Sequence, residues 1–136
     1  MIGQGLNVML VEDHAVLRGI LQEYVTNMAQ VASCRTTANA EDALEDVAQS
    51  EPDLMLIDLS LPGMSGIDLV RKLRKSHPEL RCAILSGHRS LSYARQAMDA
   101  GARGYLLKGD PSEIERGVAA IVDGRRFVSK GLGEGS

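Results

Sequence analysis

Strand-like and helix-like segments alternate along this chain, and that alternation limits the possible fold more than any other feature. Five short aliphatic runs are typical of buried strands, at 6–11, 31–35, 53–58, 80–85 and 103–107. Each run is followed by a segment with apolar residues three and four apart, which predicts a helix. Such alternation requires parallel strands joined by crossover helices on both faces of one sheet. We therefore predict an α/β fold: a flavodoxin-like, doubly wound, five-stranded parallel sheet, (βα)5, with strand order 2-1-3-4-5.

Local signals mark the ends of several helices. Asn39 and Ser65 are typical N-cap residues. Asp110-Pro111 is typical of a helix start, and Gly101 is typical of a helix end. The first helix is expected over 14–28, and its apolar period predicts an inward face made of Leu17, Ile20, Leu21, Tyr24, Val25 and Met28.

Length and composition favour one domain with one core. The chain has 136 residues, 44% of them hydrophobic, and a net charge of −3. We assign residues 6–129 to the domain and 130–136 to a disordered, Gly-rich tail or truncated linker. The net charge argues against the basic surface of a nucleic-acid binder. No apolar run approaches the roughly 20 residues of a membrane span, and the N-terminus does not resemble a signal peptide, so we expect a cytoplasmic protein.

Polar side chains follow four of the predicted strands at their carboxyl ends. Glu12 and Asp13 follow the first strand, and Asp58 ends the third. Ser86 follows the fourth strand, and Lys108 follows the fifth. These four strands are consecutive neighbours in the predicted order, and ligands bind open α/β sheets at the carboxyl ends of the strands. The sequence therefore predicts that the five side chains meet at one rim.

The charges of this set favour a divalent cation. Two carboxylates about 5 Å apart repel by roughly 3 kcal/mol at an effective dielectric constant of about 20. Glu12, Asp13 and Asp58 carry −3 and Lys108 returns +1, which leaves −2. Carboxylate ligands without Cys, and with only a lone His nearby, favour Mg²⁺, with Mn²⁺ as an alternative. Beside such an ion, Asp58 is a plausible nucleophile toward a phosphoryl donor, with Lys108 and the Ser86 hydroxyl on the phosphoryl oxygens.

These residues resemble a known family. Over 6–129, the chain resembles the receiver domain of two-component response regulators in the set Glu12-Asp13, Asp58, Pro62-Gly63, Ser86 and Lys108. The resemblance implies that Asp58 accepts a phosphoryl group from a phosphohistidine on a sensor histidine kinase or phosphotransfer protein. It implies a Mg²⁺ ion bound directly by Asp13 and Asp58, through water by Glu12, and by the Ser60 backbone carbonyl.

The resemblance also implies a switch. Ser86 and Lys108 would contact the phosphoryl group, and Tyr105 would turn inward as Ser86 is drawn toward it. The fourth helix, fifth strand and fifth helix would then change their surface, which in this family often forms a homodimer. The helix at 14–28 would dock the kinase. The chain departs from the family pattern in having Gly109 where Pro is common, and Glu12 where Asp is commoner.

The segments 100–108 and 124–128 resemble the LuxR/NarL-type subfamily, whose members carry a DNA-binding output domain. We therefore expect control of transcription through a domain absent from this sequence, and no DNA contact by the chain itself. The alternative is a stand-alone receiver or phosphorelay protein that acts through protein–protein contacts. A haloacid-dehalogenase-type phosphatase would need a second acid at position 60, where this chain has Ser60. We expect a signalling domain and not a turnover enzyme.

Overall fold

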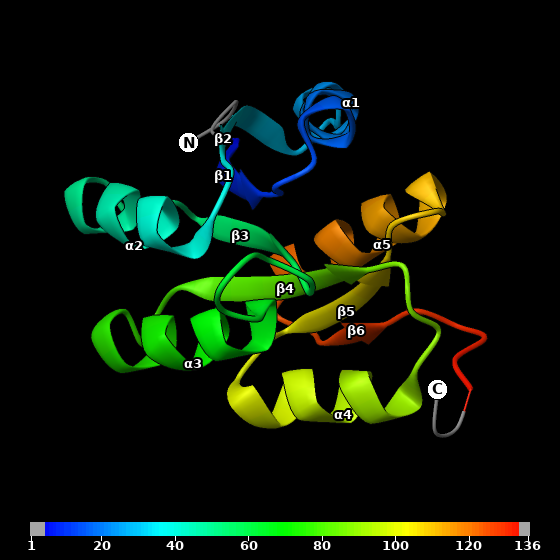
Figure 1. Ribbon diagram of the computed structural model, residues 1–136. Helices are drawn as coiled ribbons and strands as arrows, with labels where there is room; N and C mark the ends of the chain where they lie inside the picture. The colour runs from blue at the N-terminus through cyan, green and yellow to red at the C-terminus, as the bar shows by residue number, and fades with distance from the viewer. Residues whose placement is uncertain (1–4, 134–136) are drawn as a thin grey trace.

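A parallel sheet lies between two layers of helices in the computed structural model, which describes residues 5–133 (Figure 1). The strands are β1 (Leu6–Val11), β2 (Val31–Thr37), β3 (Leu54–Asp58), β4 (Arg81–Ser86), β5 (Gly104–Leu107) and β6 (Phe127–Val128). The helices are α1 (Ala15–Thr26), α2 (Ala40–Gln49), α3 (Gly66–Ser76), α4 (Leu91–Ala100) and α5 (Pro111–Val122). The strand order is β2-β1-β3-β4-β5-β6. The predicted α/β class, parallel pairing and order of the first five strands are confirmed.

Two aliphatic cores fill the spaces on either side of the sheet. Met9 and Val11 point to the side covered by α2, α3 and α4, while Val8 and Leu10 point to the side covered by α1 and α5. All five residues of β3 are buried, as the continuous apolar run predicted. This central strand therefore ends, at Asp58, in the middle of the rim formed by the carboxyl ends of the strands.

Short polar side chains cap the starts of three helices at the positions predicted from the sequence. Asn39 accepts a hydrogen bond from the amide of Asp42, and Ser65 accepts one from the amide of Asp68. Asp110 caps α5 ahead of Pro111, its first residue. These caps satisfy amide groups that a helix leaves without partners at its start.

The sheet has six strands, so the prediction of five was wrong. The amide of Phe127 donates to the carbonyl of Arg103 at 3.0 Å, and the amide of Ser129 donates to that of Tyr105 at 2.9 Å. A run of two strand residues has no detectable period, and its pairing with β5 depends on a contact distant in the sequence. The sixth strand covers the edge that β5 would otherwise expose.

The first helix differs from its prediction at both ends and on one face. It spans Ala15–Thr26, and His14 is its N-cap, with Nδ1 accepting a hydrogen bond from the amide of Leu17. Ile20, expected to face inward, is 59% exposed, and Val16 is 68% exposed. Three- and four-residue spacing identifies an apolar stripe, but it does not distinguish the core from a surface that binds a partner.

The chain beyond β6 is hydrogen-bonded to β5, to α5 and to the start of α4, and is here called the C-terminal strap (residues 129–133). Ser129 Oγ accepts a hydrogen bond from the amide of Leu107 at 3.1 Å, and the Lys130 amide donates to Glu113 Oε1 at 3.3 Å. Gly133 exchanges two backbone hydrogen bonds of 2.8 Å with Arg89 and Leu91. Lys130 and Gly133, in the tail expected to be disordered, therefore have hydrogen-bond partners, while 134–136 lie outside the described residues.

Candidate functional site

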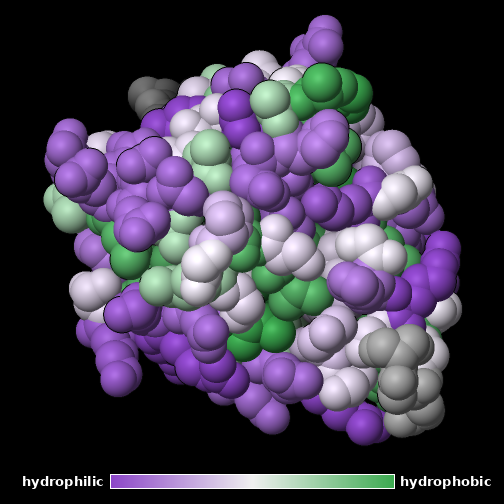
Figure 2. Space-filling model, viewed as in Figure 1, coloured by the Kyte–Doolittle hydropathy of each residue, from purple (hydrophilic) through white to green (hydrophobic). Residues whose placement is uncertain are grey.

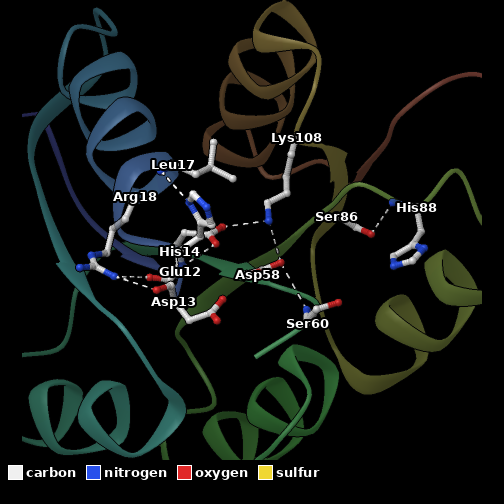
Figure 3. Close-up of polar contacts among 10 residues, drawn as sticks. All are labelled: Glu12, Asp13, His14, Leu17, Arg18, Asp58, Ser60, Ser86, His88 and Lys108. Atoms are coloured by element: carbon white, nitrogen blue, oxygen red, sulfur yellow. Dashed lines mark hydrogen bonds and ion pairs between the residues drawn. The ribbon is translucent and has the colours of Figure 1, made fainter. Parts of the chain in front are cut away.

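Three carboxylates meet at the carboxyl ends of β1 and β3 (Figure 3). Glu12 and Asp13 directly follow β1, and Asp58 is the last residue of β3. One ligand oxygen from each residue lies within 4.8 Å of the other two. Glu12 is 1% exposed and Asp58 is 4% exposed, whereas Asp13 faces solvent. The cluster thus has a buried floor and one open side.

Lys108 is the cation of the cluster. Its Nζ atom lies 3.0 Å from Glu12 Oε1 and 3.1 Å from Asp58 Oδ1. Burial opposes the charged form of this amine, but the nearby charges of Glu12 and Asp58 and the hydrogen bond to Asp58 outweigh burial, so the pKa of Lys108 is raised. The ammonium is therefore charged at neutral pH, and the four side chains sum to −2.

The buried carboxylate of Glu12 is oriented from two sides. The amide of His14 donates to Oε2 at 3.2 Å. Among residues 5–133, Oε1 is buried without a hydrogen bond of good geometry, although Lys108 Nζ is close enough for an ion pair. That contact is an ion pair, because its direction is poor for a hydrogen bond. A buried carboxylate oxygen without a well-directed hydrogen bond can accept a further positively charged partner.

Close backbone packing places Asp58 and the loop after it. The Ser60 amide donates to Asp58 Oδ1 at 3.3 Å, and the Gly66 amide donates to the carbonyl of Leu59 at 2.8 Å. A Cβ at position 66 would collide with the carbonyl of Asp58, so only glycine lets α3 begin this close to β3. The loop 59–65 is therefore held over the end of the strand that carries Asp58.

Ser86 lies at the same rim but is directed elsewhere. Its Oγ accepts a hydrogen bond from the amide of His88 at 2.9 Å and points toward His88 in Figure 3, away from Asp58 and Lys108. Tyr105 is fully buried, and its hydroxyl donates to the carbonyl of His88 at 2.8 Å. Burial raises the pKa of Tyr105. The two predicted switch residues therefore both contact one residue of the β4–α4 loop, with Tyr105 already inward.

The structure brings together Glu12, Asp13, Asp58 and Lys108. Ser86 lies beside them and accepts a backbone hydrogen bond from the amide of Lys108 at 2.9 Å, but its hydroxyl is bonded to the amide of His88. Sequence reasoning missed Arg18, whose Nη1 donates to the carbonyls of Glu12 at 2.9 Å and Asp13 at 3.3 Å. It also missed the orienting amide of His14. An arginine one turn into the helix that follows an acidic pair is the signal that could have identified the first contact.

The donor set fits a magnesium ion. It consists of carboxylate oxygens, which Mg²⁺ prefers over nitrogen or sulfur ligands, and it retains a net negative charge after Lys108 is counted. Glu12 Oε1 adds a buried oxygen that lacks a well-directed donor. The exposed side chain of Asp13 leaves the approach open to an ion that keeps several waters.

Comparisons with known proteins agree with this geometry. Residues 8–121 match the response regulator receiver domain family. The chain is 33% identical over 128 residues to the transcriptional activator protein ExaE of Pseudomonas putida, covering 93% of this chain and 60% of that protein. It is 27% identical over 130 residues to the response regulator UvrY of Escherichia coli K12, covering 95% of this chain and 60% of that protein. The chain thus spans about 60% of the length of these curated relatives.

Solved structures show the same arrangement of strands and helices. A LuxR-family two-component response regulator from Aurantimonas sp. SI85-9A1 superposes with a TM-score of 0.89 and 32% identity, covering 93% of this chain and 91% of that chain. The signal receiver domain of the putative response regulator NarL from Mycobacterium tuberculosis superposes with a TM-score of 0.82 and 27% identity, covering 90% of this chain and 99% of that chain. No helix within residues 5–133 is long and apolar enough to cross a membrane. By its matched family, its relatives and its fold, this chain belongs to the response regulator receiver domains.

Proposed function

We propose that Asp58 accepts a phosphoryl group from the phosphohistidine of a sensor histidine kinase or phosphotransfer protein, in a reaction that requires Mg²⁺. One observation carries this proposal: the Asp58 carboxylate lies within 4.8 Å of two other acidic groups and 3.1 Å from a lysine ammonium. In this arrangement a carboxylate nucleophile, metal ligands and a phosphoryl-binding cation share one small opening.

The residues of the chain divide the work of transfer. A carboxylate oxygen of Asp58 attacks phosphorus, the P–N bond of the phosphohistidine breaks, and the imidazole departs with the bonding electrons. The Lys108 ammonium turns from Asp58 to a phosphoryl oxygen, where it neutralises charge. Asp13 and Asp58, Glu12 through water and the Ser60 carbonyl would hold a Mg²⁺ ion, which would supply further charge neutralisation. A carboxylate nucleophile carries no proton to be removed, so this reaction needs no general base.

Phosphorylation then acts as a switch. The new phosphoryl oxygens attract the Ser86 hydroxyl away from the amide of His88, and this moves the β4–α4 loop. That loop also binds the hydroxyl of Tyr105, so its movement changes the contacts of β5 and the surface formed by α4, β5 and α5. We propose that this surface, to which β6 contributes in this chain, forms a homodimer or contacts an output domain.

The exposed apolar side chains of α1 support a docking site for the phosphodonor. Figure 2 shows a mostly polar face on which hydrophobic residues gather near α1 at the upper right. Val16 and Ile20 are one turn apart on this helix, which begins beside the acidic cluster. An apolar pair beside a reactive carboxylate is suited to a helical partner that brings a phosphohistidine to the opening.

The name of one relative supports a role for this receiver in the control of transcription. ExaE is a transcriptional activator, and we propose that this receiver also controls transcription, through a DNA-binding domain that this sequence does not include. A stand-alone receiver or phosphorelay protein is the second candidate. In either case the domain works in the cytoplasm as a signalling module and not as a turnover enzyme. The haloacid-dehalogenase alternative is disfavoured by Ser60, which cannot serve as a general acid as a carboxyl group could.

Phosphodonor labelling tests the assignment of Asp58. The chain is incubated with acetyl phosphate and Mg²⁺, and the added mass is measured for the wild type, Asp58→Asn and the matched control Asp123→Asn, an exposed aspartate distant from the rim. We expect labelling of the wild type and the control, and its loss in Asp58→Asn and in EDTA. Full labelling of Asp58→Asn would show that another residue accepts the phosphoryl group.

A further inference from the structure

The two metal-binding acids follow one another on a short stretch of backbone that belongs to neither a strand nor a helix. β1 ends at Val11 and α1 begins at Ala15. A helical hydrogen bond at the start of α1 runs from the amide of Arg18 to the carbonyl of His14, at 2.8 Å. The carbonyls of Glu12 and Asp13 therefore precede the hydrogen-bond ladder of α1, which cannot hold them in place.

Arg18 holds both of these carbonyls from the first turn of α1. Its Nη1 atom donates to Glu12 at 2.9 Å and to Asp13 at 3.3 Å, and the side chain reaches across the loop in Figure 3. Together with its backbone bond to His14, this single residue binds three consecutive carbonyls. One side chain thus holds the carbonyl oxygens of both acids, while the amide of Glu12 is held separately by the carbonyl of Thr37 at 3.0 Å.

Arg18 and Lys108 are cations with different positions in the site. Lys108 contacts the carboxylates themselves and competes with any metal for Glu12 Oε1 and Asp58 Oδ1. Arg18 binds carbonyl oxygens only in the contacts described, so it holds the acidic pair without occupying the oxygens that would bind an ion. Arg18 is a half-buried residue, and the planar fork of an arginine side chain suits it to a fixed structural position.

We propose that Arg18 is a positioning residue that presents the carboxylates of Glu12 and Asp13 for Mg²⁺ and thereby sets the affinity of the site for this ion. This inference rests on the proposed function. Groups that orient metal ligands typically change metal affinity by about 10- to 100-fold when they are removed. Arg18 acts on backbone and not on the ligand atoms, so we expect the lower end of that range, about tenfold.

The test separates positioning from general loss of structure. Mg²⁺ is titrated into the wild type, Arg18→Ala, Arg18→Lys and the control Arg125→Ala, whose exposed guanidinium pairs with Asp123. Binding is followed by the backbone amide NMR signals of the loop 12–14. The Mg²⁺ concentration for half-maximal labelling by acetyl phosphate is measured in parallel. Both readouts refer only to folded protein, because a misfolded fraction lowers the amplitude and does not shift the midpoint.

We expect Arg18→Ala to raise both midpoints about tenfold, with labelling restored at saturating Mg²⁺. Arg18→Lys, which keeps the charge but lacks the planar fork, should fall between Arg18→Ala and the wild type, and Arg125→Ala should match the wild type. An unchanged midpoint in folded Arg18→Ala would overturn the inference. A wild-type midpoint in Arg18→Lys would also overturn it, because charge alone would then suffice. If the wild type itself neither binds Mg²⁺ nor becomes labelled, the proposed function fails instead.

Discussion

Asp13→Asn should stabilise the protein when Mg²⁺ is absent, although it removes a proposed metal ligand. The Asp13 carboxylate has two acidic neighbours within 4.8 Å, Glu12 and Asp58. At that separation two unit charges repel by about 3.5 kcal/mol at an effective dielectric constant of about 20, and by about 0.9 kcal/mol in bulk water. Because Asp13 is exposed, the lower figure is the better guide for each pair.

The two repulsions sum to about 2 kcal/mol, and the attraction of Asp13 to the Lys108 ammonium offsets part of this. We therefore expect the free energy of unfolding to increase by about 1–2 kcal/mol in EDTA at low ionic strength. The gain should shrink as salt is added, because the separation is comparable with a Debye length of about 8 Å at physiological ionic strength.

Saturating Mg²⁺ should reverse the order of stability. A ligand at 100 times its dissociation constant adds about 2.7 kcal/mol to the protein that binds it. The wild type gains this amount and the variant, with one carboxylate fewer, gains much less. The wild type should then be more stable than Asp13→Asn by about 1 kcal/mol.

Urea unfolding followed by far-UV circular dichroism measures both differences, since the chain has no tryptophan for a fluorescence assay. Glu45→Gln is the matched control, because Glu45 is exposed on α2 and the substitution removes the same charge. Lower or equal stability of Asp13→Asn in EDTA would refute the electrostatic reasoning. If the difference in free energy of unfolding is the same in EDTA and in Mg²⁺, Asp13 does not bind the ion.

Three further predictions concern other parts of the molecule. Ile20→Glu should slow phosphotransfer from the kinase at least about tenfold yet leave labelling by acetyl phosphate unchanged. Rates are measured with both donors, and equal slowing with the kinase and with acetyl phosphate would place Ile20 outside the docking surface. Gly66→Ala should lower the free energy of unfolding by about 1–3 kcal/mol in urea, because its methyl group collides with Asp58; no loss would contradict the close packing. Burial raises the pKa of Glu113, but hydrogen bonds from Arg116, Lys130 and Ser129 outweigh it, so the net pKa is lowered. The stabilisation that Glu113 gives is therefore present above its unfolded pKa of about 4.3 and is lost as pH falls through the lower folded value. Glu113→Gln should be less stable than the wild type at pH 7. Unfolding curves measured at acid pH should show this difference shrink.

Features that depend on nearby residues were predictable from the sequence. Asn39, Ser65 and Asp110 cap helices through bonds to amides three residues away, so a short window contains the whole interaction. The positions of Asp58 and Lys108 followed from one further step, because strand ends converge once the strand order is known.

Features that depend on distant contacts or on side-chain direction were not predictable in this way. The pairing of β6 with β5 joins segments more than 20 residues apart, and it leaves no periodic signal in two residues. The hydroxyl of Ser86 has more than one possible donor at the rim, and its bond to the amide of His88 is a choice of rotamer. Ile20 shows that an apolar residue at helical spacing can lie on the surface and not in the core.

The attachment of the C-terminal strap joins two parts of the chain that are far apart in sequence. Gly133 is hydrogen-bonded to Arg89 and Leu91, which flank the start of α4, and the loop between them and β4 follows Ser86. The two backbone bonds therefore link residue 133 directly to the segment that would shift in the proposed switch. If Ser86 turns toward Asp58 on phosphorylation, as proposed, then thermodynamic reciprocity requires that binding which displaces residue 133 also alters how readily Ser86 turns.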